Sequence, residues 1–165
     1  MRVAQVMAPQ PQFCRPEDSL DYIAQLMWRY DCGFVPVCAG DGVGGPVGVI
    51  TDRDICMCAL FKGLPLSQLT VSEAISDQQQ VYVCQPDDSV AEAEELMRRA
   101  RVRRLPVINS DGSLVGVISL ADLAREAARQ QELPDKEISS SEVHATLAHI
   151  CAPAVPASAL AAPAS

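Results

Sequence analysis

The chain has 165 residues and a mass of 17.7 kDa, enough for one domain or two small coupled domains with a buried core. Hydrophobic residues make up 48% of the chain but aromatic residues only 4%, which predicts an aliphatic core. The net charge of −8 and the pI near 4.6 exclude general nucleic-acid binding, which requires a basic surface, although they allow a local basic pocket.

The first six residues enter an amphipathic pattern at once, so we expect no signal peptide. No stretch approaches the roughly 18 consecutive apolar residues that a membrane-spanning helix needs. The sequence therefore predicts a soluble, cytoplasmic protein.

The chain has seven cysteines, an odd number that does not fit the disulfide framework of a secreted protein. Cys56 and Cys58 are too close together for a usual zinc knuckle. His144 and His149 lie five residues apart, which does not align them on one face of a helix. We predict no metal site, and we expect most thiols to be small buried hydrophobic groups.

Most of the chain repeats one pattern twice, beginning with a short amphipathic lead-in helix at residues 3–7 and again at 71–75. A proline, an acidic pair and a serine then precede an apolar periodic run, at residues 16–20 and 86–90. Such residues favour the N-cap of a helix, so each copy is predicted to continue with an amphipathic helix.

Each of these helices precedes a strand that contains proline, at residues 34–38 and 105–108. Because proline removes a hydrogen-bond donor, the two strands must lie at a sheet edge or be interrupted. Turn sequences at residues 39–46 and 109–113 lead into second strands, which we expect to pair back as hairpins.

A hydroxyl residue and an aspartate three positions later mark the start of each closing helix, as Thr51 with Asp54 and as Ser119 with Asp122. This spacing is typical of a capping box, in which the hydroxyl and the carboxylate bond only to backbone amides. The same helix N-terminus also offers free amides and a positive dipole end, which suit a phosphate group. From the residues alone, both interpretations stay open.

Five arginines fall within residues 98–104 of an otherwise acidic chain. The first three suit the end of a helix, where cations complement the dipole. Arg103 and Arg104 directly precede the second proline strand, and the planar guanidinium group is well suited to phosphate. The first copy has no charge at the corresponding positions, so we expect the two clefts to be unequal.

The pattern predicts a first repeat at residues 1–62, a linker at 63–70 and a second repeat at 71–131. A C-terminal extension with a short helix is expected at 132–152, followed by an Ala/Pro/Ser tail at 153–165 that lacks the bulk to become ordered. One repeat alone would leave an apolar sheet face exposed, so the two copies should pack against each other.

Together, the doubled Gly-x-x-Thr/Ser-x-x-Asp motif, the doubled Leu/Val-Pro-Val strand and the doubled Pro-Asp/Glu-Asp-Ser helix start resemble a tandem pair of cystathionine-β-synthase (CBS) domains, or Bateman module. The resemblance covers residues 3–128. It implies an α/β (α+β) fold of two βαββα CBS repeats packed face to face with pseudo-two-fold symmetry. It also implies adenosine-type nucleotides bound between the repeats, and commonly a disc-like homodimer.

In proteins similar to this one, the aspartate of the motif holds the ribose and the hydroxyl group lies toward the phosphate. Carried over, Asp54 and Asp122 would bind ribose, and Thr51 and Ser119 would lie toward phosphate.

Phosphate-bearing ligands are expected to favour whichever cleft Arg103 and Arg104 face, with Arg53 as an addition. Adenine would need an apolar slot with backbone donors and acceptors. The candidates for its walls are Val35, Pro36, Leu105, Pro106, Cys14 and Cys84.

Cys14 and Cys38 raise a separate question. If the first strand of the first repeat runs beside its second strand, the two thiols would come within bridging distance and could form a disulfide. The alternative is a pair of reduced thiols, the usual state in the cytosol.

The resulting hypothesis is a non-enzymatic regulatory or sensor module that binds AMP, ADP, ATP, NAD or S-adenosylmethionine and signals through a homodimer or a protein partner. No obligatory cofactor, nucleic acid or membrane is expected. The alternative is a structural homodimer whose clefts are vestigial. An enzyme is disfavoured because no nucleophile–base pair, metal cluster or Walker-type loop is present.

Overall fold

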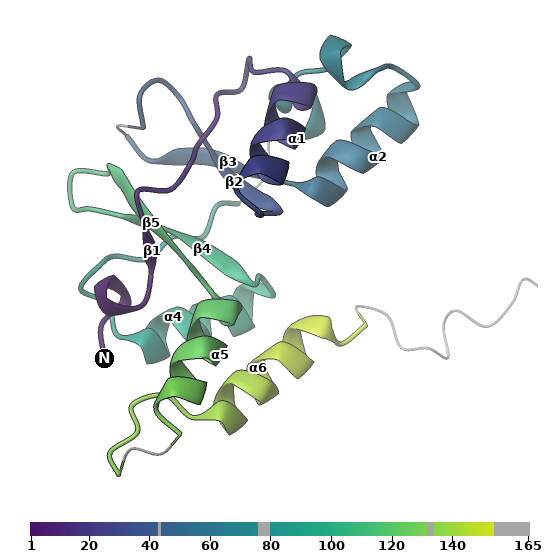
Figure 1. The fold of residues 1–165 in the computed structure, drawn as a ribbon. Coiled ribbons are helices and arrows are strands. Elements are labelled where there is room, and N and C mark those ends of the chain that lie inside the picture. The colour runs from purple at the N-terminus through teal and green to yellow at the C-terminus, as the bar shows by residue number, and fades with distance from the viewer. Residues whose placement is uncertain (43, 76–79, 132–133, 154–165) are drawn as a thin grey trace, which may run out of the picture.

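The computed structural model describes residues 1–42, 44–75, 80–131 and 134–153 of the chain. Its elements form two similar units, and Figure 1 shows their strands together in the middle of the molecule with the helices outside. The predicted fold class, an α/β (α+β) arrangement of two repeats that face each other, is confirmed.

Each repeat consists of a helix, an antiparallel hairpin and a second helix. In the first repeat these are α1 (Leu20–Arg29), β2 (Phe34–Cys38), β3 (Pro46–Thr51) and α2 (Asp52–Lys62). In the second repeat they are α4 (Val90–Ala100), β4 (Arg104–Ile108), β5 (Leu114–Ser119) and α5 (Leu120–Arg129). The hairpin registers correspond, since Phe34 faces Thr51 in one and Arg104 faces Ser119 in the other.

The proline of each hairpin lies on an edge-like strand, as predicted. β4 is the outer strand of a three-stranded sheet ordered β1-β5-β4, and β2 pairs with β3. Beside each strand, one amide bonds to the proline carbonyl: Cys14 N to Pro36 O at 3.0 Å, and Cys84 N to Pro106 O at 3.1 Å. These isolated bridges stand in place of the short first strands expected around the two cysteines.

The lead-in segments are exchanged between the repeats. Val3 is fully buried in the core of the second repeat, and its amide bonds to Asp88 O at 2.9 Å. Leu69 and Val71 are buried in the core of the first repeat, where the Val71 amide bonds to Asp18 O at 2.9 Å. The predicted repeat boundaries follow the repeat in the sequence. In the structure, the lead-in segment of each repeat packs in the core of the other repeat.

The lead-ins are also shorter than predicted. The first is a single 3-10 turn, η1 (Val3–Gln5), and the second is the one-turn helix α3 (Val71–Ala74), which follows the 3-10 turn η2 (Leu66–Gln68). After η1 the chain forms the two-residue strand β1 (Ala8–Pro9), which pairs antiparallel with β5. The N-terminal segment therefore completes the sheet of the second repeat.

The C-terminal helix α6 (Ser140–Cys151) packs against α4 and α5. Its Val143 belongs to the core of the second repeat, and Thr146 Oγ1 donates a 2.7 Å hydrogen bond to Glu94 Oε1 of α4. The extension is thus an integral part of the second repeat. The tail expected at residues 153–165 lies, from residue 154 onward, outside the described residues.

The longest of the described helices, α6, has 12 residues. Within the part of the chain that the structure describes, no helix combines the length and the apolar character needed to cross a membrane.

Candidate functional site

A cavity of about 290 Å³ lies between the two repeats, and we call it the inter-repeat cleft. The first repeat contributes residues from the hairpin and from the start of α2. The second repeat contributes the segment before Cys84 and the basic segment that joins α4 to β4. The lining residues are Phe34, Val49, Thr51, Asp54, Gln80, Val81, Tyr82, Arg101, Val102, Arg103, Arg104 and Pro106.

The motif of the first repeat forms a complete capping box at the start of α2. The Thr51 amide and Thr51 Oγ1 both donate to Asp54 Oδ2, at 2.9 and 2.7 Å, and the Asp54 amide donates to Thr51 Oγ1 at 3.3 Å. All of these carboxylate bonds go to the same oxygen, Oδ2. The capping box therefore leaves Asp54 Oδ1 available on the wall of the cleft, and the capping and ligand-binding interpretations are compatible.

The motif of the second repeat forms the same capping box, but the second oxygen of its carboxylate is also bonded. Ser119 donates from its amide and from Oγ to Asp122 Oδ2, at 2.8 and 2.5 Å. The guanidinium group of Arg125 bonds to the other oxygen, Asp122 Oδ1. Both oxygens of this carboxylate are occupied, so the two motifs differ in what they offer to a ligand.

The surroundings of the second motif differ as well. Ser119 lines a separate cavity of about 280 Å³, whose walls come from the second repeat and from α6 rather than from the first repeat. Arg103 and Arg104 also border this cavity, together with Val143 and Leu147 of α6. The arginine pair thus separates the inter-repeat cleft from the α6 side of the molecule.

Three arginines of the second repeat line the inter-repeat cleft together with Asp54 of the first repeat. The guanidinium carbon of Arg104 lies 6.0 Å from the centre of the Phe34 ring, within the range of a cation–π contact between the repeats. Because the chain as a whole carries a net charge of −8, this cleft is a local exception that favours an anionic group.

Arg101 has a role that the sequence pattern did not indicate. It is the C-cap of α4 with a left-handed backbone (φ 56°), and its side chain reaches the end of α6, where it bonds to the carbonyls of Ile150 and Ala152. The sequence pattern predicted Arg101 only as a cation at the end of a helix. In the structure, Arg101 also lines the cleft. Arg101 therefore connects the cleft wall to α6.

Tyr82 was also absent from the predicted site. It is half-buried in the cleft wall, and its hydroxyl donates to Gln80 Oε1 at 2.9 Å. A signal did exist, because Tyr82 is the only aromatic residue that follows Phe61 in the chain. A lone aromatic side chain in an aliphatic repeat is a candidate for contact with a flat ligand group.

Several predicted site residues lie elsewhere. Arg53 is exposed on α2 and is not part of the cleft lining. Of the predicted adenine walls, Pro106 lines the cleft, whereas the other five are buried in the hairpins or cores and do not reach it. These five are Val35, Pro36, Leu105, Cys14 and Cys84. They were predicted from apolar character, which cannot distinguish a cavity wall from a packed interior.

Cys14 and Cys38 lie beside each other, since the Cys38 amide bonds to Cys14 O at 2.8 Å. Both are free thiols in the structure. Burial, together with smaller contributions from the nearby Asp18 and Cys38, raises the pKa of Cys14 to about 12. Burial likewise raises the pKa of Cys38. These thiols are held in their neutral form.

No group of three or more His, Cys, Asp or Glu residues suited to a metal ion occurs among the residues that the structure describes.

A family model described as "CBS domain" matches the chain twice, at residues 3–59 and 71–129. Hypoxic response protein 1 of Mycobacterium tuberculosis is 36% identical over 108 residues, which cover 66% of this chain and 72% of that protein. The CBS domain-containing protein YhcV of Bacillus subtilis is 30% identical over 126 residues, with coverage of 74% and 82%.

Solved structures give the same result. A crystal structure of hypoxic response protein I with two coordinated zinc ions has a TM-score of 0.66 and 30% identity, and covers 76% of this chain and 98% of that one. The CBS domain protein PAE2072 from Pyrobaculum aerophilum, complexed with AMP, has a TM-score of 0.68 and 28% identity, with coverage of 81% and 98%. The chain therefore belongs to the CBS-domain family, as a tandem pair of CBS domains.

Proposed function

We propose that this protein is a non-catalytic regulatory module of the cytoplasm that binds an adenine nucleotide in the inter-repeat cleft and works as a homodimer. The observation that carries the nucleotide proposal is the composition of the cleft, which is lined both by a carboxylate with one oxygen left over from a capping box and by three arginines from the other repeat.

Each part of a nucleotide has a partner in this cleft. Asp54 Oδ1 is available to accept hydrogen bonds from ribose hydroxyl groups, as acidic residues do in other nucleotide-binding folds. Arg101, Arg103 and Arg104 supply charge-assisted donors for phosphate, and the N-terminus of α2 adds its dipole. Tyr82 and Pro106 supply apolar surface for the base.

The size of the cleft favours a mononucleotide. Its volume of about 290 Å³ lies just below the range of roughly 300–1,000 Å³ that is usual for small-molecule sites. We therefore rank AMP above the dinucleotide NAD. The relative PAE2072 was crystallised with AMP, which supports the same choice.

Isothermal titration with AMP, ATP, NAD and S-adenosylmethionine tests the proposal. We expect AMP to bind at one site per chain and Asp54→Ala to abolish that binding. Asp122→Ala is the matched control, because it removes an equivalent capping box outside the cleft. It should lower the melting temperature at least as much as Asp54→Ala does, because it also removes the ion pair with Arg125, and it should leave AMP affinity unchanged.

A second candidate function follows from the capping boxes themselves. Both motifs form complete capping boxes, so helix capping alone would account for their presence. In that case the protein would be a structural homodimer with vestigial clefts. Absence of heat and of any thermal shift with all four compounds would favour this function, and turnover of a nucleotide by the purified protein would contradict both.

A further inference from the structure

One short segment, residues 101–104, borders both the inter-repeat cleft and α6. Its three arginines line the cleft, and two of them also line the cavity whose walls include α6. The third, Arg101, donates from its guanidinium group to the carbonyls of Ile150 and Ala152, and we call this contact the α6 clamp. A ligand that enters the cleft therefore meets the same residues that contact α6.

The α6 clamp satisfies the end of a helix. The last carbonyls of a helix have no partner within it, and a cation beside them also complements the helix dipole. Nearer its start, α6 is held by other contacts, since Val143 is buried in the core and Thr146 bonds to Glu94. In the last turn, Ile150 is only partly buried. The last turn therefore depends on Arg101 more than the rest of α6 does.

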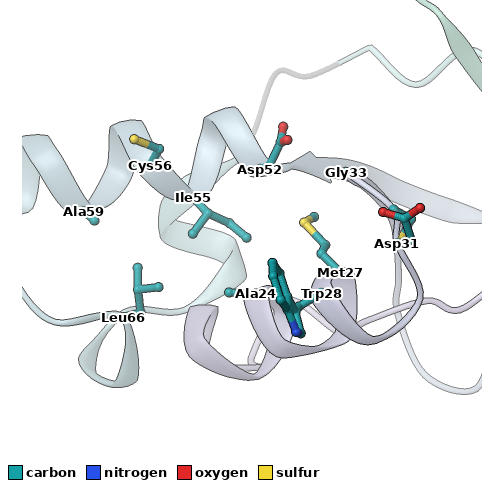
Figure 2. Close-up of a pocket in the computed structure, with 11 residues that line it drawn as sticks. Ala24, Met27, Trp28, Asp31, Gly33, Asp52, Ile55, Cys56, Ala59 and Leu66 are labelled. Atoms are coloured by element: carbon teal, nitrogen blue, oxygen red, sulfur yellow. The ribbon is translucent and has the colours of Figure 1, made fainter.

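The backbone at Arg101 is of a kind that suits glycine. Its φ of 56° lies in the left-handed region, where a side chain is unfavourable. The equivalent residue of the first repeat, Asp31, has the same conformation with a φ of 48°. Asp31 lies at one end of an open α1–α2 groove of about 640 Å³, into which Met27 and Ile55 point (Figure 2). The cation thus occurs in the repeat whose helix groove contains α6.

One guanidinium group cannot hold both the end of α6 and a phosphate in the cleft. A carbonyl oxygen carries a partial charge, whereas a phosphate carries a full negative charge and forms stronger hydrogen bonds with arginine. Arg101 is exposed, so rotation about its own side-chain bonds is enough to exchange one partner for the other. A phosphate in the cleft therefore competes with the α6 clamp.

We propose that Arg101 couples the cleft to α6. Without nucleotide it binds the end of α6, and with nucleotide its guanidinium group turns to the phosphate and releases the last turn of the helix. This inference deepens the proposed function and rests on it, since it requires a phosphate-bearing ligand in the cleft. Because linked equilibria are reciprocal, a stronger α6 clamp must weaken nucleotide binding by the same factor. α6 is then the element whose state signals that the cleft is occupied.

Hydrogen–deuterium exchange on the full-length protein measures the release. We expect saturating AMP to raise the exchange rate of the amides of residues 148–152 several-fold and to leave residues 143–146 protected. Adenosine, which lacks the phosphate, is the matched control ligand and should leave all of α6 unchanged. In Arg101→Asn, a substitution that the left-handed backbone tolerates, the last turn should exchange rapidly without AMP, and AMP should raise the rate no further.

The variant Ala152→Asp tests the reciprocal effect. It places a carboxylate beside the guanidinium group that already bonds to the carbonyl of residue 152, so the α6 clamp should become stronger. AMP affinity should fall roughly twofold to fivefold, the effect of an exposed ion pair, and adenosine affinity should not change. Ser140→Asp adds the same charge to an exposed position in the first turn of α6, roughly 18 Å away along the helix, and should leave AMP affinity unchanged.

The double variant Arg101→Asn/Ala152→Asp separates the α6 clamp from simple charge repulsion. Its AMP affinity should equal that of Arg101→Asn alone, because there is no clamp left to strengthen. A further loss in this background overturns the inference. AMP that binds the wild-type protein without changing exchange at residues 148–152 also overturns it and leaves the nucleotide proposal standing. A wild-type protein that gives no heat with AMP overturns both.

Discussion

Asp54 and Asp122 have the same sequence context and the same capping bonds, yet they present different chemistry. One oxygen of each carboxylate accepts the bonds of the box. The other oxygen of Asp122 is held by Arg125, whereas Asp54 shares the inter-repeat cleft with the arginines of the other repeat. The position equivalent to Arg125 is Met57, which has no charge to offer Asp54. The sequence contains this difference, but only the structure shows that Arg125 bonds to Asp122.

The thiols give a prediction at the same scale. Burial raises the pKa of both Cys14 and Cys84 to about 12, so these thiols stay neutral in the folded protein until the pH approaches that value. Since the thiolate is the nucleophile, iodoacetamide at pH 8 should modify the exposed Cys56 and Cys151 and leave Cys14 and Cys84 untouched. Mass spectrometry of native and denatured protein measures this, and rapid modification of Cys14 in the native state would contradict it.

At the scale of elements, helix starts that look alike in sequence are stabilised differently. Ser89 is the N-cap of α4 and forms a capping box with Glu92, in which the Glu92 amide donates to Ser89 Oγ at 3.2 Å. Ser19 is the N-cap of α1 and makes no side-chain capping bond. The Pro-acid-Asp-Ser pattern correctly predicts where both helices begin, but it does not distinguish these two bonding states.

The difference predicts unequal effects of the same substitution. Ser89→Ala should lower the free energy of unfolding by about 1 kcal/mol, the usual cost of losing an N-cap. Ser19→Ala, its matched control, should cost only a few tenths of that because no capping bond is lost. Urea denaturation of both variants measures the two values, and equal losses would contradict the assignment.

At the scale of the whole molecule, the inter-repeat cleft depends on how two covalently distant halves meet. The hairpin turns of the two repeats touch, with the Leu114 amide bonded to Gly42 O at 3.2 Å. Gly112 has a φ of +84° and packs against Gly44, a position where a side chain would be strained. This contact and the exchanged lead-ins join the two repeats around the cleft that Asp54 and the arginines line.

The positive charge of the cleft predicts that ligand affinity depends on the phosphate group of the ligand. Replacement of Arg103 and Arg104 by Gln should weaken AMP binding at least about tenfold, because charge-assisted hydrogen bonds to phosphate are lost. Adenosine, which lacks the phosphate, is the matched control and should bind both proteins with equal affinity. Calorimetry with the two ligands tests this, and an equal loss for adenosine would show that the arginines act on the fold of the cleft.

Much of the architecture is local and could be predicted from the sequence. The helices, the hairpins, the proline strands and the two Thr/Ser-x-x-Asp boxes depend on residue spacing over a few positions, and they occur twice. The inequality of the clefts was also foreseeable, since only one repeat carries arginines before its proline strand.

The rest was decided by the tertiary structure, because it depends on contacts between residues far apart in the chain. The sequence could not indicate that Val3 and Val71 exchange cores, that Arg53 and five apolar candidates stay out of the cleft, or that Tyr82 and Arg101 enter it. Nor could it indicate that α6 closes one helix groove while the other stays open. Periodicity identifies which side of an element is apolar, whereas only packing determines what that side meets.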